Sequence, residues 1–214
     1  MHARLVLART VTVAVRYLSI RRQFKDRDSD GTGPEVAVLD YPTVQIRVLP
    51  LLATSFALHY SGKAMGELYW RTRKSIEEKG DFAALADMHS ISSGLKSLCT
   101  DLAANGIETC RRAMGGHGFG GGSGLVQLNS DYLSKPTVEG DNWMITQQVA
   151  QYVIKKAKGL AEKPKSGTTK TEEILKMYLY TRDRRPMYNV LDDDDAIVQA
   201  FEWRAAHLVR SFPK

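Results

Sequence analysis

The stretch Cys110–Gln148 constrains the fold more than any other part of the chain, because it places a dense run of glycines beside a helical pattern. Gly115, Gly116, Gly118 and Gly120–Gly122 all fall within it. Glycine has no Cβ, so its backbone can turn sharply or approach another group closely. The pattern predicts a helix, a glycine turn, a polar crossing and a new helix opening after Glu139-Gly140-Asp141-Asn142. At Gly140 the main chain is expected to turn and aim the Glu139 carboxylate inward.

Apolar residues at helical spacing predict four long helices and two shorter ones along the chain. The long helices are expected at residues 3–24, 43–79, 82–114 and 142–158, and the short ones at 172–181 and 192–209. The third helix is expected to carry a set of apolar side chains on one side: Leu85, Met88, Ile91, Leu95, Leu98 and Leu102. Long helices joined by loops favour an up-down four-helix bundle. The chain is therefore predicted to be all-α, with a helical bundle over residues 1–160 and the start of a second helical domain over 161–214.

Polar segments are expected to separate these helices. Lys25–Pro34 is predicted to be a loop, Gly159–Thr169 a linker, and Arg182–Pro186 a break between the last two helices. The acidic run Asp192–Asp195 suits a helix N-terminus, where negative charge is favoured. Its acids are consecutive and lack the alternating oxygen ligands of a calcium loop, so no metal site is predicted.

Composition narrows the possible partners. The chain carries 30 Lys and Arg against 24 Asp and Glu, a net charge of +6. This excess would suit an acidic ligand, although a mildly basic solvated surface is the favoured interpretation. No basic cluster is interleaved with aromatic residues, so nucleic acid is not an expected partner. No apolar run has the length of a membrane span, and Arg9 and Arg16 interrupt the apolar segment Leu5–Leu18.

Two short motifs in the glycine turn point to sites that the context does not support. Gly116, Gly118 and Gly121 formally satisfy the dinucleotide fingerprint, but a helix precedes them where that fingerprint needs a strand. Ser123 fails as a nucleophile elbow because Leu125 occupies a position that needs glycine. His117 is a possible general base, but a turn histidine that bonds the backbone or a cofactor edge is the favoured interpretation.

The two main motifs, in this order, resemble the acyl-CoA oxidases, flavin enzymes of peroxisomal fatty-acid oxidation. The matching residues are Arg111-Arg112-Ala113-Met114-Gly115-Gly116-His117-Gly118-Phe119 and Glu139-Gly140-Asp141-Asn142, with further similarity at Leu39-Asp40-Tyr41 and Leu49–Thr54. The resemblance implies that Glu139 is the base that removes the α-proton of a fatty acyl-CoA. It further implies FAD as the acceptor of the β-hydrogen, trans-2-enoyl-CoA as the product, and dioxygen as the oxidant that yields hydrogen peroxide.

The same resemblance assigns cofactor contacts. In the wider acyl-CoA dehydrogenase superfamily, an Arg-x-Gln-Phe sequence at the end of the first helix reaches the FAD of the other subunit. Arg21, Gln23 and Phe24 match it, which implies that Arg21 meets the pyrophosphate while Gln23 and Phe24 support the adenosine half. Gly115 and Gly116 are the other implied FAD contacts. The alternative is that Arg21 only complements the dipole of the helix C-terminus.

The resemblance also implies a homodimer that shares FAD across its interface, in the peroxisome. Whole oxidases begin with a helical domain and a β-domain that hold the flavin ring, so this polypeptide alone is expected to bind FAD weakly or not at all. Two alternatives stay open: an acyl-CoA dehydrogenase, and a catalytically inactive helical dimerisation module. The continuation over Lys165–Lys214 favours the oxidase, because dehydrogenase chains tend to stop soon after the bundle.

Overall fold

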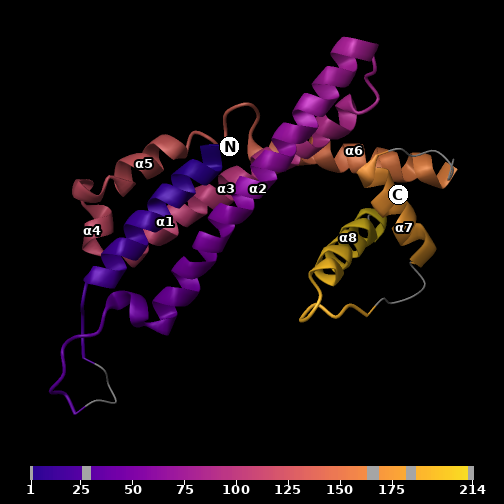
Figure 1. The fold of residues 1–214 in the computed structure, drawn as a ribbon. Coiled ribbons are helices and arrows are strands. Elements are labelled where there is room, and N and C mark those ends of the chain that lie inside the picture. The colour runs from indigo at the N-terminus through magenta and orange to yellow at the C-terminus, as the bar shows by residue number, and fades with distance from the viewer. Residues whose placement is uncertain (1, 26–29, 163–168, 182–186, 212–214) are drawn as a thin grey trace. The chain divides into compact units, whose positions relative to one another are not determined.

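A computed structural model describes residues 2–25, 30–162, 169–181 and 187–211. The regular elements of this part of the chain are all helical (Figure 1), and the only β-type pairing recorded within it is an isolated bridge between Arg22 and Ala37. The elements are α1 (His2–Ile20), η1 (Val38–Asp40), α2 (Pro42–Lys79), α3 (Leu85–Ala113), α4 (Gly116–Phe119), η2 (Gly121–Ser123), α5 (Leu125–Tyr132), α6 (Asn142–Glu162), α7 (Lys170–Thr181) and α8 (Asp194–Ser211). The prediction of an all-α fold is confirmed.

The chain divides into two compact units. The first comprises Met1–Arg71 and Leu95–Asn142, and the second comprises Thr72–Gly94 and Trp143–Lys214. The candidate site residues all belong to the first unit. A division between residues 160 and 161 stays a prediction.

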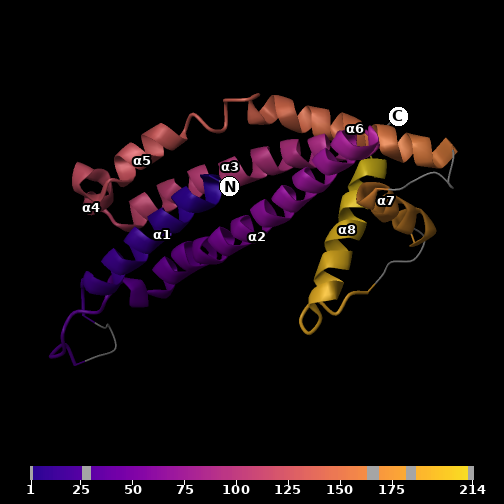
Figure 2. The ribbon, with the colours of Figure 1, turned by 45° about the horizontal axis from the view of Figure 1, so that its top comes forward.

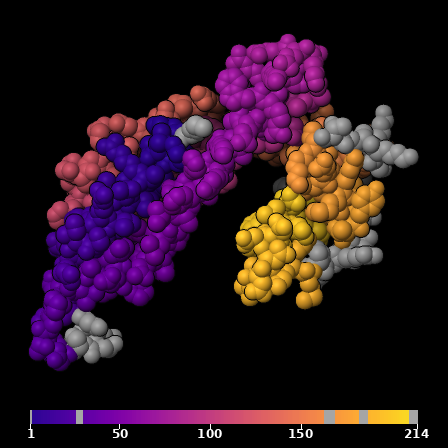
Figure 3. Space-filling model, in the orientation of Figure 1, coloured from indigo at the N-terminus to yellow at the C-terminus, as the bar shows by residue number. Residues whose placement is uncertain are grey.

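The core of the first unit forms where α1 packs against α2 and α3. The most buried side chains of α1 follow one helical face: Leu7, Val11, Ala14 and Leu18. Burying a leucine of this kind contributes about 1.5–3 kcal/mol to folding. The surfaces of α1 and α2 meet along the unit (Figure 3). On α3, Gly106 permits the close approach, because an added Cβ would lie only 2.5 Å from the Cδ1 atom of Leu7.

The buried face of α3 in the first unit is not the side that carries the large leucines. Leu98 and Leu102, which belong to the apolar side indicated by the sequence, are 57% and 39% exposed. Ala103, Ile107 and Cys110 are buried in their place. Small residues on this second face let α3 lie close to α1. The side of α3 that is buried is therefore the one that allows this close approach, and not the one with the largest side chains.

Several helix ends were predicted correctly. Pro42 is the first residue of α2, as its fixed φ and missing N–H favour. Gly80 follows the end of α2 with φ of 62°, the left-handed conformation typical of a residue after a helix. The helix boundaries of α7 and α8 lie within two residues of those predicted.

Other boundaries were wrong. The first helix ends at Ile20 rather than residue 24, because Arg21 to Phe24 instead pair with the segment before η1. The predicted crossing after the glycine turn contains α5, an eight-residue helix. The linker was expected to begin at Gly159, but α6 continues through Glu162. The rest of that linker (163–168), the expected break at 182–186 and part of the expected loop (26–29) lie outside the described residues.

The second unit contains a small apolar core and a buried polar cluster. Leu175 and Tyr178 of α7 pack with Ala206 of α8, and the two helices lie side by side in both views (Figures 1 and 2). Near the start of α3, the buried Asp87 carboxylate accepts hydrogen bonds from the hydroxyls of Tyr152 at 3.1 Å and Thr171 at 2.9 Å. These contacts fasten α6 and α7 to the beginning of α3 within this unit.

Candidate active site

The glycine turn folds directly back onto the last turn of α3. Gly115 has φ of 58°, which only glycine adopts readily, and α4 begins at the next residue. Gly118 is buried so tightly that an added Cβ would lie 1.9 Å from the carbonyl oxygen of Arg111. The turn therefore needs glycine at both positions, at the first for its conformation and at the second for its close contact.

The turn is also fastened to α1. The Tyr17 hydroxyl and the Nδ1 atom of His117 lie 2.8 Å apart, and the two ring centroids are 5.0 Å apart. The sequence favoured a His117 bond to the backbone or to a cofactor edge; its ring instead contacts a side chain of the first helix. This contact places the glycine turn beside the C-terminal end of α1.

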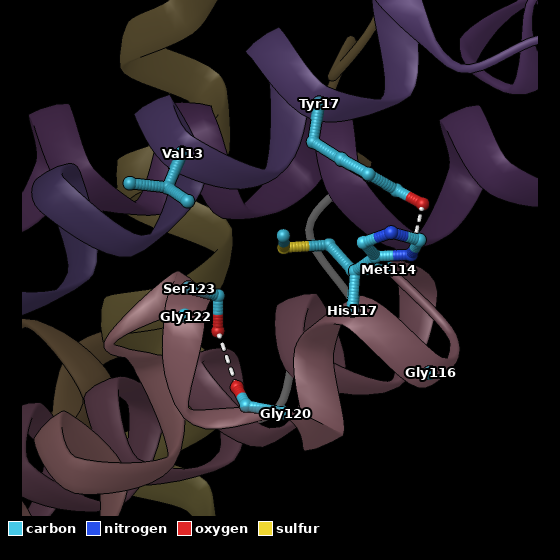
Figure 4. A pocket seen from close by; sticks show the side chains of 8 residues that line it. All are labelled: Val13, Tyr17, Met114, Gly116, His117, Gly120, Gly122 and Ser123. Atoms are coloured by element: carbon cyan, nitrogen blue, oxygen red, sulfur yellow. Dashed lines mark hydrogen bonds between the residues drawn. The ribbon is translucent and has the colours of Figure 1, made fainter.

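A pocket of about 510 Å³ opens between α1 and the turn. Figure 4 shows Val13 and Tyr17 on α1 facing the turn, with the His117 ring extended toward the Tyr17 hydroxyl. The lining residues are Val13, Tyr17, Met114, Gly116, His117, Gly120, Gly122 and Ser123. The pocket volume falls within the range of small-molecule sites. Apolar side chains line the pocket together with backbone polar groups, the Tyr17 hydroxyl and the His117 ring.

The Arg21–Phe24 segment continues from this same end of α1. The backbone N–H of Gln23 donates to the Val36 carbonyl at 3.0 Å, and the Tyr41 hydroxyl donates to the backbone carbonyl of Gln23 at 2.7 Å. Phe24 has φ of 61° and its side chain is 67% exposed. Arg21, Gln23 and Phe24 are thus presented on a backbone held by hydrogen bonds, near the glycine turn.

A charged cluster supports the turn from α3. The Nε and Nη2 groups of Arg111 each donate to one oxygen of the Glu108 carboxylate at 2.7 Å, and Arg112 Nε donates to it at 2.6 Å. Hydrogen bonding from Arg111 is the main reason that the pKa of Glu108 falls to about 2. Asn129 of α5 also donates to this carboxylate at 3.3 Å, which links α5 to α3.

Glu139 lies on a turn that few non-glycine residues adopt. Its φ is 59° and that of Gly140 is 100°. A left-handed conformation at a residue with a Cβ costs about 1–2 kcal/mol, so surrounding contacts must hold it. The Glu139 side chain, which was expected to be aimed inward, is exposed in this single chain. The turn predicted at Gly140 is present, while a catalytic role for Glu139 stays a prediction.

Lys96 and Asn142 hold this turn against α3, and the sequence did not indicate either role. The Lys96 ammonium donates to the carbonyls of Pro136 at 3.1 Å and Gly140 at 2.6 Å and to Oδ1 of Asn142 at 2.8 Å. The buried Asn142 amide group in turn donates to three acceptors on α3: the Ser97 carbonyl, the Thr100 hydroxyl and the Asp101 carboxylate. The only available signal was a single lysine in α3 beside an apolar pattern.

The candidate residues form two groups along α3, one beside Lys96 near the middle of the helix and one after its last residue, Ala113. Lys96, which contacts the Glu139 turn, and Ala113, which precedes the glycine turn, are separated by about 25 Å along the helix at 1.5 Å per residue. The ring contacts to α1 show the same direction along the unit. His117 contacts Tyr17 near the end of α1, whereas Tyr132 of α5 contacts His2 at the beginning of α1, with 5.6 Å between the ring centroids. The Tyr17–His117 contact places the end of α1, from which the Arg21–Phe24 segment continues, beside the glycine turn, whereas the Glu139 turn contacts α3 at Lys96.

The described residues contain no group of three or more His, Cys, Asp or Glu side chains placed to hold a metal ion. Within the same ranges, no helix is both long and apolar enough to cross a bilayer.

Comparison with known proteins gives one consistent family. A family model described as the acyl-CoA oxidase C-alpha1 domain matches residues 1–154. A putative peroxisomal acyl-coenzyme A oxidase 1.2 from Arabidopsis thaliana is 37% identical over 212 residues, covering 97% of this chain and 31% of that protein. The solved structure of Arabidopsis thaliana acyl-CoA oxidase 1 is 33% identical, with a TM-score of 0.88 over 98% of this chain and 32% of that one.

A second solved structure carries ligands. Acyl-CoA oxidase-2 from Caenorhabditis elegans, bound with FAD, ascaroside-CoA and ATP, is 31% identical with a TM-score of 0.83, covering 98% of this chain and 30% of that one. The chain thus spans about a third of the length of these relatives. The family-model match begins in α1 and ends within α6, so it includes both the glycine turn and the Glu139 turn. This chain belongs to the acyl-CoA oxidase family.

Proposed function

We propose that this chain forms the part of an acyl-CoA oxidase that carries the catalytic base. The reaction is the α,β-desaturation of a fatty acyl-CoA to a trans-2-enoyl-CoA in fatty-acid β-oxidation, with electrons passed to dioxygen. The observation that carries the proposal is the family match over residues 1–154, which contains Glu139 on its left-handed turn. The curated relatives are named peroxisomal, and the peroxisome is the compartment proposed for this chain.

Glu139 is the proposed base. Abstraction of a proton next to a thioester carbonyl requires a carboxylate held within reach of that proton. The side chain projects from a turn rather than from a helix face, and it is exposed where a substrate would have to approach. A substrate chain and a flavin ring over this carboxylate would exclude water and raise its basicity.

FAD is the proposed cofactor, and the residues at the other end of the unit fit it. No atom lies within 4 Å of a Cβ placed on Gly115 or Gly116, so the outer face of the turn is open to a ligand. Arg21 and Phe24 are exposed beside it and offer a guanidinium for phosphates and a ring for stacking. When bound, FAD would accept the β-hydrogen as a hydride, and its reoxidation by dioxygen would give hydrogen peroxide.

The separation of the two groups supports a homodimer. Glu139 must act beside a flavin ring, whereas the glycine turn follows Ala113, about 25 Å along α3 from the Lys96 that contacts the Glu139 turn. We propose that Glu139 serves one FAD and that Arg21, Gln23, Phe24, Gly115 and Gly116 contact the FAD of the partner chain. An acyl-CoA dehydrogenase is less favoured because the family match is to the oxidases.

The test compares Glu139→Gln with Glu67→Gln, a matched change at an exposed glutamate of α2. In the full-length, FAD-loaded protein, Glu139→Gln is expected to retain flavin. The rate at which acyl-CoA bleaches that flavin is expected to fall about 100-fold or more. Glu67→Gln should behave as the unsubstituted protein. Normal bleaching in Glu139→Gln would reject the role of this carboxylate.

Further measurements separate the alternatives. Oxygen consumption with formation of hydrogen peroxide is expected for an oxidase. Bleaching by acyl-CoA without oxygen consumption would identify a dehydrogenase. A dimer in gel filtration that carries no flavin, even with FAD supplied during purification of the full-length protein, would identify a helical dimerisation module.

A further inference from the structure

The Glu139 turn is in contact with a cation from α3, the Lys96 ammonium. Glu139 and Gly140 both have positive φ values, 59° and 100°, and neither lies in a helix or a strand. A peptide segment in this conformation can relax toward the commoner regions of φ and ψ unless its carbonyls are held in place.

Lys96 supplies that restraint on both sides of Glu139. An ammonium has three N–H donors and no acceptor. All three have an oxygen within reach: the Pro136 carbonyl before Glu139, the Gly140 carbonyl directly after it, and Oδ1 of Asn142. The charge makes these bonds stronger than those between neutral groups.

Asn142 connects this restraint back to α3. Its side-chain oxygen accepts from Lys96, so its Nδ2 group donates to the Thr100 hydroxyl at 2.9 Å and the Asp101 carboxylate at 2.8 Å. Its backbone amide donates to the Pro136 carbonyl at 3.0 Å. Lys96 and Asn142 thus share the Pro136 carbonyl, and the turn has two fixed points on one helix.

We infer that Lys96 is a positioning residue, which sets the direction of the Glu139 carboxylate by holding the backbone on both sides of it. The inference rests on the proposed function, since it concerns the base of that reaction. Lys96 does not contact the reacting atoms in this role. It reduces the number of conformations from which the carboxylate would have to reach the substrate proton.

The first test needs neither flavin nor substrate. Lys96→Met removes all three donors, and Lys63→Met, at an exposed lysine of α2, is the matched control. Hydrogen exchange is followed at the amides of Val138 and Asn142, which donate to Ser134 and Pro136 at 3.0 Å. Lys96→Met is expected to speed exchange at these amides roughly tenfold or more, the effect of losing charge-assisted hydrogen bonds, while the amides of α1 keep their protection.

Two results of that test overturn the inference: unchanged exchange at the turn, or an equal increase throughout α1, which would mean general destabilisation. Lys96→Gln retains two donors and replaces Lys96→Met if the latter does not fold. For Lys96→Gln, the exchange rates at the turn are expected to lie between those of the unsubstituted chain and those expected for Lys96→Met. Unchanged exchange rates would again overturn the inference.

The second test uses the full-length, FAD-loaded protein. Lys96→Met is expected to lower kcat about tenfold or more, because fewer conformers present the base correctly, with unchanged flavin content and little change in KM. An unchanged kcat beside a loosened turn overturns the positioning role. Failure of the proposed function has a different signature, since Glu139→Gln would then reduce flavin normally whatever happens at the turn.

Discussion

Substitution of Gly118 by alanine should displace the glycine turn from α3. An added Cβ would lie 1.9 Å from the carbonyl oxygen of Arg111 and 2.7 Å from its carbonyl carbon. Carbon and oxygen atoms without a covalent link normally approach to about 3.3 Å, so about 1.4 Å of movement is needed. Both obstructing atoms belong to the backbone of α3, which cannot rotate aside as a side chain would.

The expected cost follows from that geometry. Overpacking in a tight contact typically destabilises by 1–3 kcal/mol, and a backbone clash of this depth belongs near 3 kcal/mol, roughly. For a chain of about this length, such a loss lowers the melting temperature by about 6–12 °C. The pocket between α1 and the turn should also lose the Tyr17–His117 contact, since His117 neighbours the displaced residue.

Thermal unfolding of Gly118→Ala beside Gly122→Ala measures the effect. Gly122 has no atom within 4 Å of an added Cβ and no positive φ, so its substitution is expected to change stability by less than about 0.5 kcal/mol. Melting temperatures that agree within error for the two variants would show that α4 does not pack against α3 as described.

Two further predictions use the same unit. Gly106→Ala should cost only about 1 kcal/mol in unfolding free energy, less than Gly118→Ala, because the Cβ would meet the end of a flexible leucine side chain at 2.5 Å; equal losses in chemical denaturation would contradict this. The pKa of Glu108 is lowered from 4.5 to about 2, so its ion pairs stabilise the fold above pH 4.5, and that stability is lost as the pH falls toward 2. With allowance for solvent screening the loss is about 1–2 kcal/mol, and Glu108→Gln should remove this part of the acid dependence; an unchanged pH profile of unfolding would contradict the assignment.

The long helices and their ends were predictable because their signals are local. Apolar spacing located α2, α3 and α6, and the backbone preferences of Pro42 and Gly80 suit the positions where α2 begins and ends. The turn at Gly140 was predicted for the same reason, because a glycine after a charged residue allows the positive φ that the structure shows.

The remaining features depend on contacts between distant residues. The eight residues of α5 are too few for a stable isolated helix, and this helix is supported by contacts to α3 and α1 such as Asn129 with Glu108. The buried face of α3 could not be read from its large leucines, because Leu98 and Leu102 are exposed while Gly106 fits closely against Leu7. Lys96 was missed because a lone lysine in a helix looks solvated until its acceptors, some 40 residues later, are known.

The geometry of the proposed reaction is therefore set mainly by residues that carry no chemistry of their own. Gly106 and Gly118 determine how closely α1 and α4 approach α3. Because α3 also holds Lys96, the same helix contacts the Glu139 turn near its middle and leads into the glycine turn at its C-terminal end. An α-helix is stiff over this length, so two half-sites mounted on it keep a constant separation. A fixed separation is what a dimer would need if each flavin were to be shared between the base of one chain and the arginine of its partner.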